Sequence, residues 1–241
     1  MPDTRQVTRA ARFPRTRFPA IARRPFLLYG QARAGGNLLG SLLASHPSVH
    51  LAPELLAAPG RRPERALERE RRRHRGRHVG VRMEADHLLG HGLTPASWLA
   101  QASARGWLVV HVERRDTLRH VLASMRRPLF AVDPAQLLAD MEHRAGLCHA
   151  ERADLRGVEH LTVCYEDDVL PAGDAWQRVT DRVFAALGLA SVPVSTRVRH
   201  VADLPLSSLI GNPDEVTRAL QGTCFAHLAS RSELDRDLPA S

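Results

Sequence analysis

The stretch that decides the fold reads Pro25-Phe-Leu-Leu-Tyr-Gly-Gln-Ala-Arg33-Ala-Gly-Gly-Asn-Leu-Leu-Gly-Ser-Leu-Leu-Ala-Ser-His-Pro47. It predicts an apolar strand, then a turn with glycines at 30, 35 and 36, then an amphipathic helix. Glycine permits positive φ and close backbone approach, so successive N–H groups can point at an anion while the helix offers its positive dipole end. Arg33 adds a full charge inside the turn. The stretch therefore predicts a phosphate-binding loop.

Lysine is absent from the chain, and all 34 of the residues counted as Lys or Arg are arginines. A Walker A loop needs Gly-x-x-x-x-Gly-Lys-Ser/Thr, in which the lysine contacts the β- and γ-phosphates and the hydroxyl binds magnesium. Here the corresponding stretch ends in Asn37-Leu38. We therefore expect the loop to bind phosphate without hydrolysing ATP.

Motifs in this loop and downstream of it resemble those of sulfotransferases. The loop, followed by Ala44-Ser-His-Pro47, is similar to the 5′-phosphosulfate loop of that family, and Val79-Gly-Val-Arg-Met83 looks like its second strand. Val109-Val-His-Val-Glu-Arg-Arg-Asp116, running into Ser124, resembles its 3′-phosphate motif. Tyr165-Glu-Asp-Asp-Val-Leu170, followed by a helix ending in Leu187-Gly-Leu189, is similar to another segment of the same family. Ile210-Gly-Asn-Pro-Asp-Glu215 with Leu220-Gln-Gly-Thr223 resembles the closing segment of its bacterial carbohydrate-type members. The resemblance covers about residues 25–230, in matching order.

The resemblance implies that 3′-phosphoadenosine 5′-phosphosulfate (PAPS) is the co-substrate. Its 5′-phosphosulfate would lie in the loop formed by Gln31, Ala32, Arg33, Ala34, Gly35, Gly36, Asn37 and Leu38. Its 3′-phosphate would be held by Ser124 with either Arg114 or Arg115, because a guanidinium can donate two parallel hydrogen bonds to an oxyanion. The implied reaction transfers a sulfuryl group to a hydroxyl of a carbohydrate, glycolipid or secondary metabolite.

Sulfuryl transfer needs stabilisation of the leaving phosphate and a base for the proton of the acceptor. Arg33 and the loop N–H groups are expected to supply the first. For the base we favour Glu54, whose position is similar to that of the glutamate in carbohydrate sulfotransferases, with a capping role as the competing interpretation. Four histidines near the crevice edge are rival bases: His46, His50, His78 and His111.

No metal is expected. No histidine pair has the spacing of a metal site with supporting ligands, and sulfuryl transfer requires none. The pair Asp167-Asp168 is typical of a magnesium site in other contexts, but the resemblance places it in a structural Tyr-Glu-Asp corner.

Alternating strand and helix patterns indicate the fold class. Apolar runs predict strands over 25–30, 78–83, 107–113 and 160–165, and helices are expected over 37–45, 117–127, 134–154 and 175–187. The pattern predicts an α/β protein with a three-layer, P-loop-like fold, in which helices flank a central parallel sheet. Since ligands bind at the carboxyl ends of such strands, both phosphate motifs should face one crevice.

One domain is expected, over residues 25–230, between flexible tails. Residues 1–24 form an arginine-rich tail, for which a transit peptide is the alternative, and residues 231–241 form the second tail. The segment 57–77 reads as an insertion, either an exposed helix or a mobile loop near the substrate entrance, or a simple solvated surface.

Composition argues against a nucleic-acid-binding protein and against a membrane-spanning protein. The net charge is +8, but aromatic residues make up only 5% of the chain and the arginines form no nucleic-acid reader motif, so no nucleic-acid partner is expected. No apolar run is long enough for a transmembrane segment. The three cysteines are widely spaced and odd in number, which favours a reducing cytoplasm. The oligomeric state is left open, with a homodimer as one option.

Two other functions remain as alternatives. Ala34 and Gly36 stand where hydroxyl residues usually donate to the phosphosulfate, so the chain is alternatively a degenerate sulfotransferase-like protein that binds a nucleotide or sulfated ligand without turnover. A lysine-free relative of nucleotide kinases is the third hypothesis.

Overall fold

The computed structural model describes residues 23–52, 55, 63–125, 131–198 and 204–228. Its centre is a five-stranded sheet in which every pair is parallel and the strand order is β2-β3-β1-β4-β5. The strands are β1 (Phe26–Tyr29), β2 (Val49–Ala52), β3 (His78–Met83), β4 (Leu108–Glu113) and β5 (His160–Cys164). The predicted parallel α/β fold is confirmed. Strand β2 was missed, because four residues at a sheet edge carry little periodic signal.

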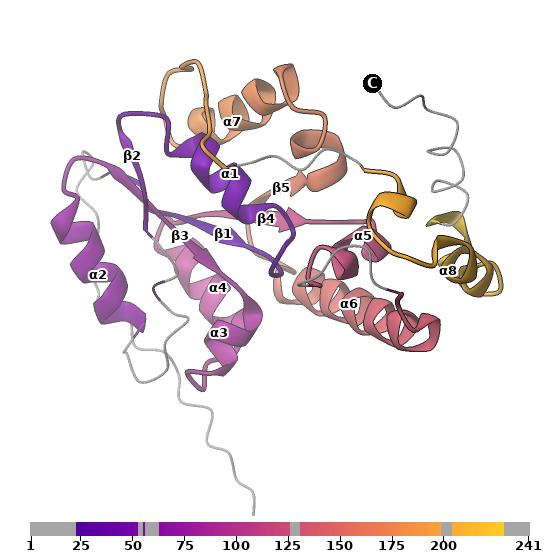
Figure 1. Cartoon of the computed structure of the whole chain (residues 1–241). Coiled ribbons are helices and arrows are strands. Elements are labelled where there is room, and N and C mark those ends of the chain that lie inside the picture. The colour runs from indigo at the N-terminus through magenta and orange to yellow at the C-terminus, as the bar shows by residue number, and fades with distance from the viewer. Residues whose placement is uncertain (1–22, 53–54, 56–62, 126–130, 199–203, 229–241) are drawn as a thin grey trace, which may run out of the picture.

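Helices cover both faces of the sheet (Figure 1). Helices α1 and α7 lie on one face, and α3, α4 and α6 lie on the other. The helices are α1 (Gly36–Leu43), α2 (Pro63–Arg73), α3 (Ala85–Leu89), α4 (Pro95–Ala104), α5 (Thr117–Leu122), α6 (Pro134–Asp154), α7 (Asp174–Ala186) and α8 (Pro213–Leu220). A π-helical turn (Tyr165–Val169) and a 3-10 turn (Leu206–Ser208) complete the described elements. The helix predicted over 117–127 is wrong at its end, since α5 stops at Leu122.

Strand β1 is apolar throughout because both of its faces are buried. Phe26 and Leu28 belong to the apolar cluster that includes α1 and α7, whereas Leu27 and Tyr29 belong to the cluster on the α4 side. Side chains alternate between the two faces of a strand, so a central parallel strand reads as one unbroken apolar run. This is why the opening stretch of the sequence was decisive.

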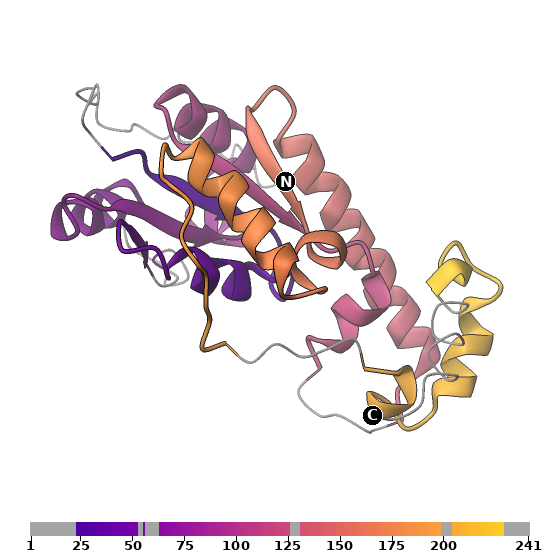
Figure 2. The same ribbon diagram turned by 90° about the horizontal axis from the view of Figure 1, so that it is seen from above.

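A third apolar cluster lies beyond the end of the sheet (Figure 2). It joins Leu137 and Met141 of α6 to Val216 and Leu220 of α8, with residues of α5. Helix α6 thus spans from one face of the sheet to this outer cluster. The C-terminal described segment is thereby packed beside the site-bearing edge rather than on a separate unit.

The structure describes little of the two expected tails. Residues 1–22 and 229–241 lie outside the described residues, and they hold most of the expected N-terminal tail and all of the expected C-terminal tail. Arg24 donates to the carbonyl oxygens of Gly106 (2.9 Å) and Ala186 (3.0 Å), so the domain includes this residue. Within the expected insertion 57–77, α2 is a helix with one buried face, because Leu67 joins the core.

The strand order sets the position of the crevice. Strand β1 lies between β3 and β4, and the chain first crosses to the β2 side and later to the β5 side. In open parallel sheets, ligands bind beside the carboxyl ends of strands where the connections diverge in this way. At that point Gly30 passes so close to β4 that a Cβ there would lie 2.2 Å from the carbonyl oxygen of Val112.

Candidate functional site

The β1–α1 loop has the backbone shape of an anion cradle. Arg33 has φ 67° and Gly35 has φ 102°, both in the left-handed region. A Cβ on Gly35 would lie 2.5 Å from the ring of Tyr165, so no side chain fits there. Helix α1 begins directly afterwards, and no side chain of the described residues caps its start. Its first N–H groups are therefore oriented as donors toward the crevice.

Other loop residues contribute through packing rather than through polar side chains. Ala34 and Leu38 are buried in the core cluster with α1. The amide oxygen of Asn37 accepts a 2.6 Å hydrogen bond from Arg82 of β3, which ties the start of α1 to the neighbouring strand. The loop thus offers backbone N–H groups and the Arg33 side chain, without hydroxyl donors.

The structure separates the two adjacent arginines that follow β4. The guanidinium of Arg114 lies 4.4 Å from the ring centroid of Tyr165, and it donates to the carbonyl oxygen of Arg33 at 3.4 Å. Arg115 instead forms an ion pair with Asp167. Arg114 is therefore the one that lies against the loop.

A carboxylate holds the backbone of this turn. Glu166 accepts hydrogen bonds from the N–H groups of Arg115 (3.1 Å) and Asp116 (3.0 Å). Burial acts to raise the pKa of Glu166, but these hydrogen bonds outweigh it and the pKa is lowered. Asp116 in turn caps α5 by accepting from the Arg119 N–H. Glu166 is thus an ionised anchor for the β4–α5 turn.

Helices α5 and α6 flank the β1–α1 loop on the side of the β4–α5 turn. His120 contacts the carbonyl oxygen of Ala32 through Nε2 at 2.7 Å. Burial lowers the pKa of His120 to about 4, so the ring is neutral and Nε2 is the donor to that carbonyl. Arg144 donates to Ser124 Oγ (3.2 Å) and to Gln31 Oε1 (3.4 Å). These contacts bring Ser124 and the loop to the same edge.

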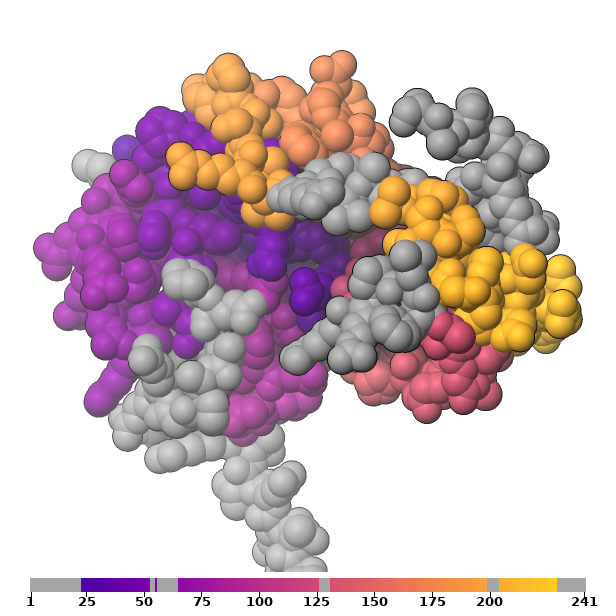
Figure 3. Space-filling model, viewed as in Figure 1, coloured from indigo at the N-terminus to yellow at the C-terminus, as the bar shows by residue number. Residues whose placement is uncertain are grey.

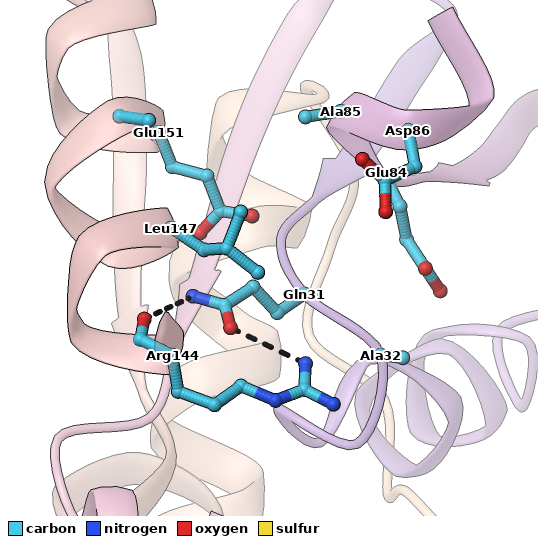
Figure 4. Close-up of a pocket in the computed structure, with 9 residues that line it drawn as sticks. Gln31, Ala32, Glu84, Ala85, Asp86, Arg144, Leu147 and Glu151 are labelled. Atoms are coloured by element: carbon cyan, nitrogen blue, oxygen red, sulfur yellow. Dashed lines mark hydrogen bonds between the residues drawn. The ribbon is translucent and has the colours of Figure 1, made fainter. Parts of the chain in front are cut away.

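A pocket opens beside the loop, between α6 and the start of α3 (Figure 4). Glu151 of α6 and Asp86 of α3 lie on opposite sides of it, and Gln31 bridges to Arg144 at its base. The lining residues are Gln31, Ala32, Glu84, Ala85, Asp86, Arg144, Leu147, Ala150 and Glu151. Figure 3 shows the indigo, early part of the chain at the bottom of a hollow on this face.

Glu151 is the buried carboxylate of this pocket. Burial raises its pKa, although His111 of β4, whose Nε2 lies 3.6 Å from Glu151 Oε2, acts in the opposite direction. A carboxyl group with a raised pKa is better matched to proton transfer near neutral pH. The arrangement therefore offers a candidate base that the sequence did not single out.

The predicted base and its rivals have different surroundings. Glu54 lies outside the described residues. His46 accepts from the Ser48 N–H through Nδ1 and packs on a core ring, as expected for a turn residue, and His78 contacts the Arg24 carbonyl oxygen. His50 lies on β2, close to Glu70 of α2.

The Asp167-Asp168 segment has structural contacts. Asp168 accepts from the Cys164 N–H at 2.9 Å and pairs with Arg182 at 3.0 Å. Asp167 pairs with Arg115. Among the described residues the segment therefore serves as a corner that joins β5, α7 and the β4–α5 turn.

Sequence reasoning missed Glu84, Asp86, Arg144 and Glu151. Glu84 and Asp86 follow the carboxyl end of β3, which is a usable signal in a parallel sheet. Arg144 and Glu151 lie about two turns apart on one side of α6. That spacing marks a shared helix face, but only the packing of α6 shows that the face meets the loop.

No protein-family model and no curated protein matches this chain. Among solved structures, the crystal structure of a sulfotransferase from Alicyclobacillus acidocaldarius is similar to it in fold. The TM-score is 0.51 at 17% sequence identity, and the match covers 90% of this chain and 98% of that chain. The likeness extends over nearly the whole of both proteins and agrees with the fold class predicted from the sequence.

Proposed function

We propose that this protein is a PAPS-dependent sulfotransferase that transfers a sulfuryl group to a hydroxyl of a small molecule or glycan. The observation that carries the proposal is the convergence of the β1–α1 loop, Arg114 and Ser124 at one edge of the sheet. A bisphosphorylated nucleotide needs two separate groups of anion donors within one crevice. The similar fold of a sulfotransferase supports the same function.

The loop is suited to the 5′-phosphosulfate. Backbone N–H groups at the start of α1 and the guanidinium of Arg33 would stabilise negative charge on the leaving phosphate. For the 3′-phosphate we assign Arg114 rather than Arg115, because Arg115 is paired with Asp167. Ser124 would donate its hydroxyl to the same phosphate. No metal has a role in this assignment.

The acceptor pocket favours a hydroxyl-rich molecule. Glu84, Asp86 and Glu151 supply carboxylate oxygens, which accept hydrogen bonds from hydroxyl groups, and Arg144 supplies donors. This composition supports a carbohydrate or glycolipid head group as the acceptor. The acceptor oxygen would attack sulfur, the bond from sulfur to the phosphate oxygen would break, and the acceptor proton would pass to a carboxylate.

Glu151 and Glu54 are the two candidates for that carboxylate. Glu151 is supported by its burial in the pocket and by its contact with His111. Replacing each by glutamine separates them. The variant of the true base loses the acidic limb of the rate profile, where the wild-type rate falls as the base is protonated, and loses most of kcat, by about 10²- to 10⁴-fold. The other variant retains a wild-type profile.

A non-catalytic ligand-binding protein is the second candidate function. It is favoured by Ala34, whose side chain is buried and offers no donor, and by Gly36 at the start of α1. Such a protein would bind the bisphosphate product without transferring sulfate.

The described helices include none long and apolar enough to cross a membrane, and the three cysteines are free. We propose a cytoplasmic location and leave a homodimer open.

Calorimetry with 3′-phosphoadenosine 5′-phosphate tests the function first. AMP and ATP serve as controls for the 3′-phosphate and for the kinase hypothesis. The proposal expects binding that is lost for AMP and in a double variant, Arg114→Ala with Arg115→Ala. Equal affinity for AMP would overturn it. Binding without sulfate transfer from PAPS to any acceptor of a hydroxyl library would favour the non-catalytic protein.

A further inference from the structure

Three metal-ligating side chains meet away from the crevice, at the β2 edge of the sheet, where α2 lies (Figure 1). His50 comes from β2, Glu70 from the last turn of α2, and His74 directly follows that helix. Their ligand atoms all lie within 4.8 Å of one another. Sequence spacing did not reveal this group, because His50 is distant in the chain from the other two residues.

The separations match those of a small coordination sphere. Glu70 Oε1 lies 3.5 Å from His50 Nε2 and 3.2 Å from His74 Nε2. Ligands on a tetrahedral zinc ion, with bonds of about 2.0–2.1 Å, lie about 3.3 Å apart. The two imidazole rings are stacked, with centroids 3.4 Å apart and an angle of 17° between their planes. A shared ion therefore requires the rings to tilt so that both Nε2 atoms point at it.

Glu70 and His50 supply the buried ligand atoms of the group. Arg73 approaches Glu70 from the other oxygen, Oε2, at 3.7 Å, so Oε1 remains directed at the two imidazoles. Glu70 is buried, and His50 Nε2 is shielded from solvent with no hydrogen-bond partner among the described residues.

We propose that His50, Glu70 and His74 bind a divalent transition-metal ion of the zinc type. Two imidazoles and one carboxylate form a set that zinc accepts, with solvent as a fourth ligand. The ion would join the edge strand β2 to α2, two elements that are separated in the sequence. This structural role is independent of the proposed sulfuryl transfer.

The test is a titration of the full chain with Zn²⁺ after removal of metal by a chelator. We expect one saturable site by calorimetry, and a Co²⁺ spectrum with the intense visible bands of tetrahedral coordination. At free zinc about 100 times the dissociation constant, the thermal midpoint should rise by about 5–10 °C. Mg²⁺, which prefers six oxygen ligands, should produce neither the spectrum nor the shift.

Variants locate the site. His74→Ala should weaken zinc binding by at least about 10- to 100-fold, since even loss of an outer-shell partner has that effect. Glu70→Gln keeps the side-chain shape and serves if the alanine variant does not fold. His143→Ala, an exposed histidine of α6, is the matched control and should bind as the wild type does. Absence of saturable binding, or binding unchanged in both site variants, would overturn the proposal.

Discussion

The β1–α1 loop and the β4–α5 turn lie at the same edge of the sheet, but different interactions fix them. The loop is fixed by close packing, because a Cβ on Gly30 would meet Val112 and a Cβ on Gly35 would meet Tyr165. The turn is held by the charged carboxylate of Glu166, which accepts hydrogen bonds from two of its N–H groups. The first region should be intolerant of added atoms, and the second should respond to charge removal and pH.

Gly35→Ala should have the largest effect. The added methyl group meets the Tyr165 ring, and a left-handed φ disfavours any Cβ. Left-handed strain costs about 1–2 kcal/mol and overpacking about 1–3 kcal/mol, so the free energy of unfolding should fall by about 2–5 kcal/mol. Denaturant unfolding measures this loss. Calorimetry on the folded fraction should show no binding of 3′-phosphoadenosine 5′-phosphate.

Gly146→Ala is the matched control for that variant. Gly146 lies within α6, and a Cβ there meets nothing within 4 Å. The alanine should stabilise the protein by about 0.5–1 kcal/mol, because glycine is a poor helix former. If Gly35→Ala proved as stable as the wild type and bound the nucleotide normally, packing would not be what fixes the loop.

Arg114→Ala and Arg115→Ala should differ strongly in their effect on nucleotide affinity. Arg114 lies over Tyr165 beside the loop, so its loss should weaken binding by about 10- to 100-fold, the value of a charge-assisted hydrogen bond. Arg115 forms a half-exposed pair with Asp167, and its loss should change affinity by less than about 3-fold. Calorimetry at two salt concentrations measures both. The reverse order would assign the 3′-phosphate to Arg115.

The sequence predicted the loop well because its information is local. An apolar run, three glycines and a following amphipathic helix all lie within one stretch, and a buried central strand must read in that way. The choice between Arg114 and Arg115 was not decidable from the chain. It depends on Tyr165 and Asp167, which follow a different strand.

The missed parts of the site depend on packing between distant elements. Glu151 becomes a pocket residue only because α6 lies against the loop, and the metal-ligating group requires β2 beside α2. Strand β2 itself was missed, since two of its four residues are only partly buried. A single sequence carries the pattern within an element, but not the neighbours that the element meets.

The charge of Glu166 makes the conformation of the β4–α5 turn, and with it the position of Arg114 beside the loop, dependent on pH. Glu166 holds the turn that carries Arg114, and its pKa in the folded protein is lowered by the backbone hydrogen bonds that outweigh burial. A carboxyl group with a lowered folded pKa contributes stability that is present above its unfolded value and is lost as the pH falls through the folded value. Asp116 acts in the opposite direction, because burial raises its pKa. A variant at Glu166 removes the pH-dependent contribution of Glu166 and leaves that of Asp116 in place.

Glu166→Gln should therefore destabilise the protein less than Gly35→Ala does, and to an extent that depends on pH. At pH 7 the amide cannot accept from both N–H groups, and the free energy of unfolding should fall by about 1–3 kcal/mol. Below pH about 4.5, the ordinary glutamate value, the wild type loses the same contribution, so the two stability curves should converge. Denaturant unfolding across this range measures the difference. Glu142→Gln, an exposed carboxylate of α6, should follow the wild-type curve. A difference that stays constant with pH would mean that shape, rather than the charge of Glu166, holds the turn.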